Sequence, residues 1–400
     1  MLPGNMKITD INATWLRYNI PPSNQHVSDF GRLQTFDMTL VRIETDAGLT
    51  GFGEAKGAVG SAAICSPIVS VINEELRPLL VGEDPRNITK LWERMYNGVR
   101  AHYAVEYGRS FPELGRRGIR ISAISGVDMA LWDLLGKSLN VPVYQLLGGK
   151  CREMIPAYAS GGWADASGIG EQLKQTIAAS GERGSFKAVK MRIGTMDKTV
   201  ENSIARVRAA REALGPEVKL MADAHGTWNE REAKRFCRGV EDCNLSWLEE
   251  PVNPDAIQAM AEVRAATDIP IAAGESLFTR FDFRELIEAR AVDVLQPDPG
   301  IAGGVTEVMR IAALASAHQL TLAPHLWGSS LLFAAGLHLA AAVPNVVTVE
   351  YSMGFNPFLR GLSPDEFIIN NSEVAIPDKP GLGVTINEDF VREYTYPAFA

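Results

Sequence analysis

After about residue 150, the chain alternates between short apolar runs with β-strand character and longer segments of helical composition. The eight apolar runs are PAYASG, FKAVKMRIG, VKLMADAHG, LSWLEEP, IPIAAGE, VDVLQPD, LTLAPH and VVTVEYS. Strands that alternate with helices pair in parallel, because a crossover helix is the usual way for the chain to return to the same end of a sheet. Eight such units predict a closed (β/α)-barrel.

The first 55 residues show a different alternation, which is typical of strands. Residues 7–20 alternate apolar and polar positions, and residues 38–55 predict two strands joined by an Asp-Ala-Gly turn at 46–48. Between them, residues 21–36 are polar and contain Pro and Gly, so they predict a loop. Such a loop is usually a connector, but a mobile flap over a functional site is the alternative.

Between residues 66 and 135 the chain has helical periodicity. The clearest helix is expected at residues 121–137, with Gly136 near its end as a C-terminal breaker. The late segment IPDKPGLGVTINEDFVREY lies outside the alternation of strands and helices. We expect it to pack back on the N-terminal part of the chain.

The composition is that of a globular protein without a nucleic-acid-binding surface. Hydrophobic residues make up 46% of the 400 residues and charged residues 22%, which predicts a large buried core. The net charge of −9 is opposite to the clustered positive charge that phosphate binding needs. It is equally consistent with carboxylates gathered around a divalent cation.

The sequence shows neither a targeting signal nor a crosslinking pattern. Its N-terminus has no apolar core long enough for a signal peptide, and the apolar stretch LLFAAGLHLAAAVP is about half the length of a membrane span. That stretch predicts a buried helix. The four cysteines have no C-x-x-C spacing, so we expect neither a zinc knuckle nor a disulfide scaffold. We predict a soluble, cytoplasmic protein that binds neither nucleic acid nor membrane.

Three acids at the ends of consecutive β-like runs are the most informative polar residues. Asp223, Glu249 and Glu275 are each separated by about one βα unit. Acids so placed point into the same mouth of a barrel, where barrel enzymes keep their chemistry. Any one of them alone is typical of a helix N-cap or a salt bridge, but three converging carboxylates repel one another without a cation. Oxygen ligands favour a hard ion such as Mg2+.

The same spacing continues in the later runs. Asp298 ends VDVLQPD, His325 ends LTLAPH and Glu350 lies in VVTVEYS. A lone histidine at a strand end is usually structural. With an aspartate on the neighbouring strand it forms a dyad, in which the carboxylate orients the imidazole and raises its basicity. We therefore expect Asp298 and His325 to act together.

Three more polar residues are expected at the same mouth. Lys190 and Arg192 are two apart on one strand and so face the same way, into the barrel. Their alternative role is simple charge compensation of the acids. His225 lies two residues after Asp223 and shares its face, which favours a chemical role over that of a packed histidine.

These segments resemble the enolase superfamily, and within it the mandelate racemase-like subgroup. The similarity covers nearly the whole chain, in ISAISGVDMALWDLLGK, VPVYQLLGG, VKMRIG, MADAH, WLEEP, AAGES, LQPDPGIAGG and APHLWGSS. It implies a (β/α)7β TIM-like barrel with an α+β capping domain. The boundaries that we expect are 1–130 for the capping domain, 131–370 for the barrel and 371–400 for a C-terminal segment that packs back on the cap.

The resemblance also implies roles for the polar residues at the barrel mouth. The implied Mg2+ ligands are Asp223, Glu249 and Glu275, with Glu250 as an outer-shell residue. Asp298 and His325 match the His–Asp dyad of the subgroup. Glu350 matches an acid that hydrogen-bonds the substrate carboxylate, and it would have to be protonated to donate.

Substrate selection is implied for segments of the capping domain. The flap at 21–36 and the loop after Gly53 match segments that select the substrate in relatives, with His26 and Lys56 as possible contacts. Trp327, in APHLWGSS, is a third candidate contact. Relatives commonly form dimers or octamers, so a homo-oligomer is expected.

Arg192 stands where many relatives carry a lysine base. Arginine stays protonated at ordinary pH and is a poor base, which argues against a two-base racemase. Lys190 could still serve as a base if Arg192 depressed its pKa. A racemase, an epimerase or a sugar-lactone cycloisomerase that uses Lys190 and His325 is therefore the alternative to our main hypothesis.

His225 stands where many relatives have asparagine, and it leads to that main hypothesis. Dehydratases of sugar acids such as galactonate and mannonate are similar in having Asp-x-His there. We expect His325, oriented by Asp298, to remove the C2 proton of an aldonate or aldarate. His225 then protonates the departing 3-hydroxyl, and the enol tautomerises to a 2-keto-3-deoxy acid.

Lys190 and Arg192 would hold the substrate carboxylate or stabilise the enolate. A catalytically inactive metabolite-binding barrel is a further alternative. The intact set of metal ligands, dyad and Glu350 argues against it.

Overall fold

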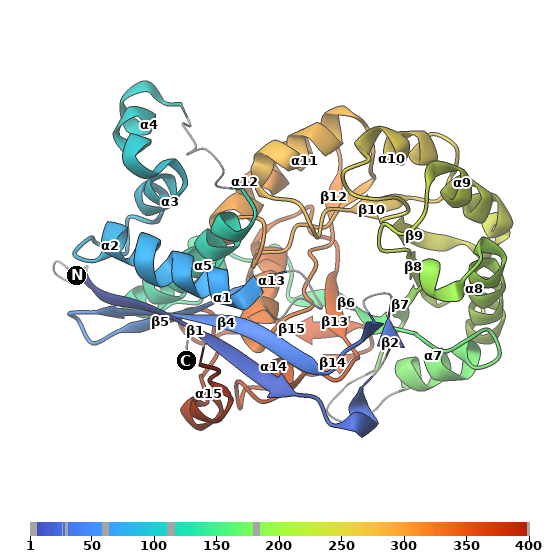
Figure 1. The fold of residues 1–400 in the computed structure, drawn as a ribbon, viewed down its shortest axis with the longest axis horizontal. Coiled ribbons are helices and arrows are strands. Elements are labelled where there is room, and N and C mark those ends of the chain that lie inside the picture. The colour runs from blue at the N-terminus through green and yellow to red at the C-terminus, as the bar shows by residue number, and fades with distance from the viewer. Residues whose placement is uncertain are drawn as a thin grey trace.

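The computed structural model describes residues 6–25, 27–28, 31–57, 64–109, 117–178 and 185–397 (Figure 1). The later part of the chain forms a barrel with an outer ring of helices. The first part forms a smaller sheet covered by helices, which lies against one side of the barrel (Figure 1). The predicted fold class, a barrel with an α+β cap, is confirmed.

The barrel strands coincide one for one with the predicted apolar runs. They are β6 (Met154–Gly161), β7 (Ala188–Arg192), β8 (Lys219–Asp223), β9 (Leu245–Glu249), β10 (Ile271–Ala273), β11 (Val294–Leu295), β12 (Thr321–Leu322) and β13 (Val349–Ser352). Neighbours pair in parallel from β6 to β12, and β13 pairs with β6. A bridge between Leu322 and Val346 links the two remaining neighbours and closes the barrel.

Each strand except the last is followed by a helix of the outer ring. These helices are α7 (Ile169–Ala178), α8 (Val200–Leu214), α9 (Glu230–Gly239), α10 (Ile257–Arg264), α11 (Thr279–Glu288), α12 (Gly304–Ala317) and α13 (Ser330–Ala342). Shorter elements of the chain are η1 (Pro22–Asn24), β2 (Val27–Ser28), β3 (Gly31–Arg32), α6 (Val143–Leu146), η5 (Thr195–Asp197), η6 (Glu241–Cys243) and α14 (Pro357–Arg360).

A layer of side chains fills the barrel, so the site has a solid floor. Its members come from seven neighbouring strands or their ends and are buried: Tyr158, Ala188, Met221, Trp247, Ala272, Val294 and Ala323. Interior positions of barrel strands are normally packed in this way, which confines the chemistry to the mouth.

The cap is built on an antiparallel sheet with strand order β1–β4–β5. Its elements are β1 (Ile8–Asn19), β4 (Thr35–Thr45), β5 (Thr50–Ala55), α1 (Cys65–Ser70), η3 (Val71–Leu76), α2 (Arg77–Leu80), α3 (Ile88–Asn97), η4 (Gly98–Arg100), α4 (Ala101–Tyr107) and α5 (Ile119–Leu139). Helix α5 packs so closely on β5 that a Cβ added at Gly53 would lie 2.1 Å from the carbonyl oxygen of Gly126. Only glycine fits there.

Gly136 lies near the end of the long helix, as expected, but the prediction that it breaks the helix is wrong. Helix α5 continues to Leu139, and Asn140 follows in the left-handed conformation with φ 55°. Gly136 instead allows a close approach, because a Cβ added to it would lie 2.7 Å from Gly381. The expected domain boundary after residue 130 falls inside this helix.

The end of the chain contacts both the barrel and the cap. Strand β15 (Glu373–Ala375) pairs with β6 and with β14 (Ile369–Asn370). After α15 (Glu388–Tyr394), the amide of Tyr396 donates to the carbonyl of Trp15, and the two rings are 4.6 Å apart. The C-terminal segment therefore bridges the two sheets.

Two further expectations concern apolar residues and cysteines. Helix α13 is buried along nearly its whole length, as predicted for that stretch. Within the described ranges, no helix is both long and apolar enough to cross a membrane. The four cysteines are free thiols, of which Cys151 alone is exposed.

Candidate active site

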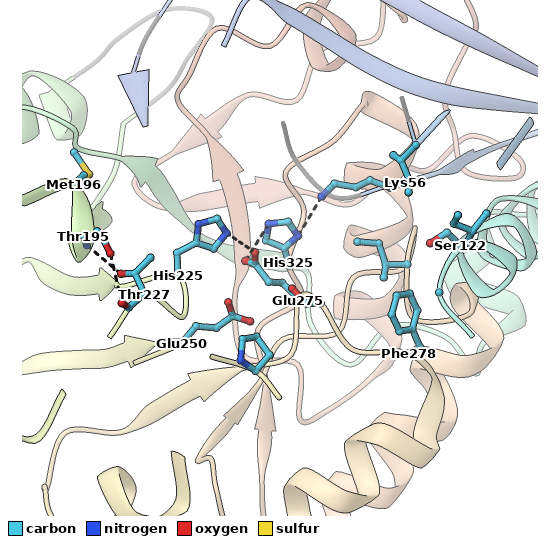
Figure 2. A pocket seen from close by; sticks show the side chains of 17 residues that line it. Lys56, Ser122, Thr195, Met196, His225, Thr227, Glu250, Glu275, Phe278 and His325 are labelled. Atoms are coloured by element: carbon cyan, nitrogen blue, oxygen red, sulfur yellow. Dashed lines mark hydrogen bonds and ion pairs between the residues drawn. The ribbon is translucent and has the colours of Figure 1, made fainter. Parts of the chain in front are cut away.

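The carboxyl ends of the barrel strands surround a cavity of about 800 Å³, which the cap partly covers. His225, Glu250, Glu275 and His325 line it from the barrel side, and Lys56 lines it from the cap side (Figure 2). Apolar side chains complete the wall near the start of α5, among them Ile64, Ile119, Phe278 and Ile301.

Asp298 and His325 form the predicted pair. Nδ1 of His325 lies 2.8 Å from Oδ2 of Asp298, and Asp298 is fully buried. The other oxygen of Asp298 accepts from the amide of Gly300 at 2.7 Å. Because a carboxylate accepts, it holds the proton of His325 on Nδ1 and leaves Nε2 facing the cavity.

The surroundings of His325 strengthen it as a base. Burial and the ammonium of Lys56 lower its pKa, but Glu275, Glu350 and Asp298 raise it by more, so its pKa lies above the usual value. A histidine with a raised pKa holds an abstracted proton more firmly.

His225 lies on the other side of Glu275 from His325 (Figure 2). It lies two residues after the end of β8, with φ 52°, and its amide donates to Oδ1 of Asp223 at 2.9 Å. Its Nε2 is 3.1 Å from Oε1 of Glu275, whereas Nε2 of His325 is 3.5 Å from Oε2 of the same carboxylate. Burial raises the pKa of Glu275, but His325, His225 and Lys190 lower it to well below its usual value. This carboxylate therefore accepts a hydrogen bond from Nε2–H of His225.

Lys190 is surrounded by carboxylates. Its ammonium is 2.5 Å from Oε1 of Glu249, 3.0 Å from Oε1 of Glu350 and 3.6 Å from Oδ2 of Asp223. Burial alone would lower its pKa, but these carboxylates raise it well above the usual value. Arg192 contacts Asp223 as well, at 3.0 Å. Lys190 is thus held as a cation and is poorly suited to take up a proton.

The partners of Glu350 favour its carboxylate form, whereas the resemblance implies a protonated donor. Burial raises its pKa, but Lys190 and other partners lower it to about 2. Its Oε2 accepts from the amide of Leu326 at 3.0 Å. Its place beside Lys190 and His325 still puts it at the barrel mouth.

Glu250 lies closer to the centre of the site than the sequence suggests. Alternation along β9 would point it away from Glu249, but its φ of 39° turns the chain and brings its side chain to the cavity. It is buried, and its Oε1 has no hydrogen-bond partner within the described part of the chain. A ring nitrogen of His225 and a carboxylate oxygen from each of Glu250 and Glu275, which are atoms that can ligate a metal, lie within 4.8 Å of one another.

Burial raises the pKa of Glu250 well above its usual value, and repulsion from Glu275 and Asp223 adds to this. Burial also raises the pKa of Glu249, to about 7. Buried acids that repel one another fit a divalent cation, which would relieve the repulsion. The acids at this mouth are therefore chemically suited to a metal such as Mg2+.

Of the three predicted substrate contacts, the described residues include Lys56 and Trp327. Lys56 reaches the dyad, with its ammonium 2.8 Å from Oδ2 of Asp298. Trp327 is not among the residues that line the described cavity, and its ring packs edge-on against Trp163 at 6.1 Å. His26 lies outside the described residues.

Two family models match the chain. The mandelate racemase / muconate lactonizing enzyme N-terminal domain matches residues 13–148, and the enolase C-terminal domain-like model matches residues 168–390. Together they span both the cap and the barrel.

Two relatives are similar over most of the chain. D-galactarolactone cycloisomerase of Agrobacterium fabrum is 34% identical over 402 residues, which cover 98% of this chain and 100% of the relative. Arabinonate dehydratase of Saccharolobus solfataricus is 35% identical over 359 residues, or 90% of each chain.

Solved structures agree in fold and in extent. A member of the enolase superfamily from Polaromonas sp. JS666 has a TM-score of 0.87 and 35% identity, covering 98% of each chain. A racemase from Streptomyces coelicolor A3(2), solved with bound magnesium, has a TM-score of 0.81 and 30% identity, covering 97% of this chain and 100% of its own.

Proposed function

The chain belongs to the mandelate racemase / muconate lactonizing enzyme family of the enolase superfamily, and from this premise we propose that it is a Mg2+-dependent sugar-acid dehydratase. The observation that carries the proposal is the placement of two imidazoles. His225 and His325 approach opposite oxygens of Glu275, at 3.1 and 3.5 Å, and both line the cavity. Dehydration needs a base and an acid at adjacent carbons, and two histidines so placed meet that need.

The proposed reaction begins with proton removal at C2 of an aldonate or aldarate. Nε2 of His325 accepts the C2 proton, and the electron pair of the broken bond is delocalised into the carboxylate as an enolate. The electron pair of the enolate then forms a C2–C3 double bond. The C3–O bond breaks, and its electron pair leaves on the hydroxyl oxygen. His225 gives its Nε2 proton to the departing hydroxyl, which leaves as water. The resulting enol tautomerises to a 2-keto-3-deoxy acid, with no change in overall oxidation state.

The proposed ligands of Mg2+ are Asp223, Glu249 and Glu275, and Glu250 lies beside them. The buried, unpartnered oxygen of Glu250 supports a cation at this place. When bound, Mg2+ supplies positive charge that stabilises the enolate. Lys190 and Arg192 add fixed positive charge on the same side, through their contacts with Glu249, Glu350 and Asp223.

Isomerisation is the second candidate, because the chain is 34% identical to a D-galactarolactone cycloisomerase over 98% of its length. A racemase or epimerase would need a second base opposite His325. Lys190 is the candidate for that base, but its three carboxylate neighbours favour its protonated form. This geometry supports dehydration over two-base isomerisation.

The test is a screen of the purified protein with Mg2+ against a panel of aldonates and aldarates. We expect at least one acid to give a product that reacts with semicarbazide and has lost one water by mass. His325→Asn, measured beside the wild type, should give no product. A product of unchanged mass would support isomerisation instead, and unchanged substrate across the panel would contradict the proposal.

A further inference from the structure

Lys56 connects the cap to the dyad of the barrel. It follows β5 of the cap sheet and points toward His325 (Figure 2), and its ammonium lies 2.8 Å from Oδ2 of Asp298. Its backbone amide donates to the carbonyl of Gly300 at 3.0 Å. Both its main chain and its side chain are therefore attached to the short segment that carries Asp298.

A second contact fixes the same end of β5. Glu54, two residues before Lys56, accepts from the amide of Ser329 at 2.9 Å and is buried. Residues two apart on a strand face the same way. The end of β5 thus docks on the barrel through two side chains, Glu54 on the amide of Ser329 and Lys56 on Asp298.

The position of Lys56 does not suit a direct substrate ligand. Its ammonium is 3.3 Å from Nδ1 of His325, and both nitrogens approach the same oxygen of Asp298. With the proton of His325 on Nδ1, both groups donate to that oxygen. The side chain of Lys56 is only 10% exposed, which leaves little of it to the cavity.

A cation here stabilises the form of Asp298 that orients the imidazole. Asp298 is fully buried, and burial acts to raise its pKa. Lys56 and His325 lower the pKa by more, so it lies below the usual value and the group stays a carboxylate. As a carboxylate, Asp298 can accept from Gly300, Lys56 and Nδ1–H of His325 together, which leaves Nε2 free for the substrate.

We propose that Lys56 is a positioning residue, through which the cap holds the Asp298–His325 pair ready to remove the C2 proton. This role rests on the proposed function. It differs from the role of a substrate contact, because Lys56 acts through Asp298. The base is then complete only when the cap is docked on the barrel.

Kinetics of Lys56→Met test this role on whichever acid the wild type converts. We expect kcat to fall roughly 10- to 100-fold with little change in KM, which is the usual size of an effect from a residue that orients a catalytic group. Lys56→Arg keeps the positive charge and should recover part of kcat. Lys379→Met, which removes an exposed ion pair with Asp365, is the matched control and should behave as wild type. A raised KM with unchanged kcat would show a substrate contact and overturn the proposal.

A second measurement needs no substrate. Nitrogen NMR of protein labelled at histidine, with His325→Asn for assignment, reads which ring nitrogen of His325 carries the proton. We expect Nδ1–H in the wild type and loss of that signature in Lys56→Met, or in Lys56→Gln if Lys56→Met does not fold. An unchanged signature in the folded variant refutes the positioning role. If the wild type converts none of the acids but the NMR change is as expected, the proposed function is contradicted and the positioning role of Lys56 is supported.

Discussion

At the scale of single residues, His225 is the residue on which the choice between the proposed reactions depends. Its φ of 52° turns the chain two residues after β8, and its ring reaches Glu275. It faces the same carboxylate as His325 from the opposite side (Figure 2). In such a pair, one imidazole can act as the base and the other as the acid.

Replacement of His225 by asparagine should separate the two halves of the reaction. We expect dehydration to fall roughly 10²- to 10⁴-fold, because the leaving hydroxyl loses its acid. Exchange of the C2 proton with D2O should persist, because His325 and Asp298 are untouched. Proton NMR in D2O measures exchange, and semicarbazide measures the 2-keto acid.

The matched control is His318→Asn, an exposed histidine after α12, which should change neither rate. If His225→Asn loses exchange and dehydration together, then His225 takes part in proton removal and is not only the acid.

At the scale of elements, some helices are joined to one another through buried polar contacts. One such contact joins α13 to α6, where the amide of Tyr144 donates to Nδ1 of His338 at 3.2 Å. His338 is fully buried, and burial lowers its pKa to about 4. This histidine is neutral in the folded protein at any pH well above that value.

His338 should make the protein sensitive to acid. Its folded-state pKa of about 4 is lower than the unfolded value of roughly 6.5, so the unfolded state binds the extra proton. The contribution of His338 to the free energy of unfolding is fully present above about pH 6.5. It falls by about 3 kcal/mol as the pH is lowered toward 4.

Urea unfolding at pH 7 and pH 4 measures this loss, in wild type and in His338→Met. We expect the variant to lose about 3 kcal/mol less between the two pH values, whatever its stability at pH 7. Equal losses in the two proteins would mean that other groups cause the acid sensitivity.

At the scale of the whole molecule, the site is complete only where two bodies meet. The barrel supplies the acids and both histidines to the cavity, whereas the cap supplies Lys56, just after β5, and Ile119 and Ser122 from the start of α5. The C-terminal segment joins both bodies through Tyr396 and β15. The barrel therefore carries the acids and histidines that react, and the cap encloses them.

Mg2+ should stabilise the whole molecule, because the crowded acids lose their mutual repulsion when a cation binds. Adding Mg2+ to protein treated with EDTA should raise Tm, since a ligand at 100 times its Kd contributes about 2.7 kcal/mol. EDTA should also abolish formation of the 2-keto acid.

Glu275→Gln should lose the shift in Tm, and Glu153→Gln, a change at an exposed ion pair, should keep it. Differential scanning fluorimetry with and without Mg2+ makes the comparison. A shift of equal size in Glu275→Gln would mean that the cation binds elsewhere.

The sequence by itself determined the barrel, the order of its strands and the acids at their ends. Local alternation predicts strands and helices, and parallel strands separated by one βα unit bring their carboxyl ends to the same mouth. The pairing of Asp298 with His325 follows from this rule, because they end neighbouring strands.

Only the tertiary structure decided which further groups reach that mouth. Lys56 and Asp298 are 242 residues apart, and no local pattern reports a contact made by docking two bodies. Glu250 enters through a backbone turn that strand alternation does not predict. Gly136 is needed where α5 approaches Gly381, far along the chain, because a Cβ there would lie 2.7 Å from Gly381. Contacts between distant segments depend on how whole elements pack, and that information is not present in any short window of sequence.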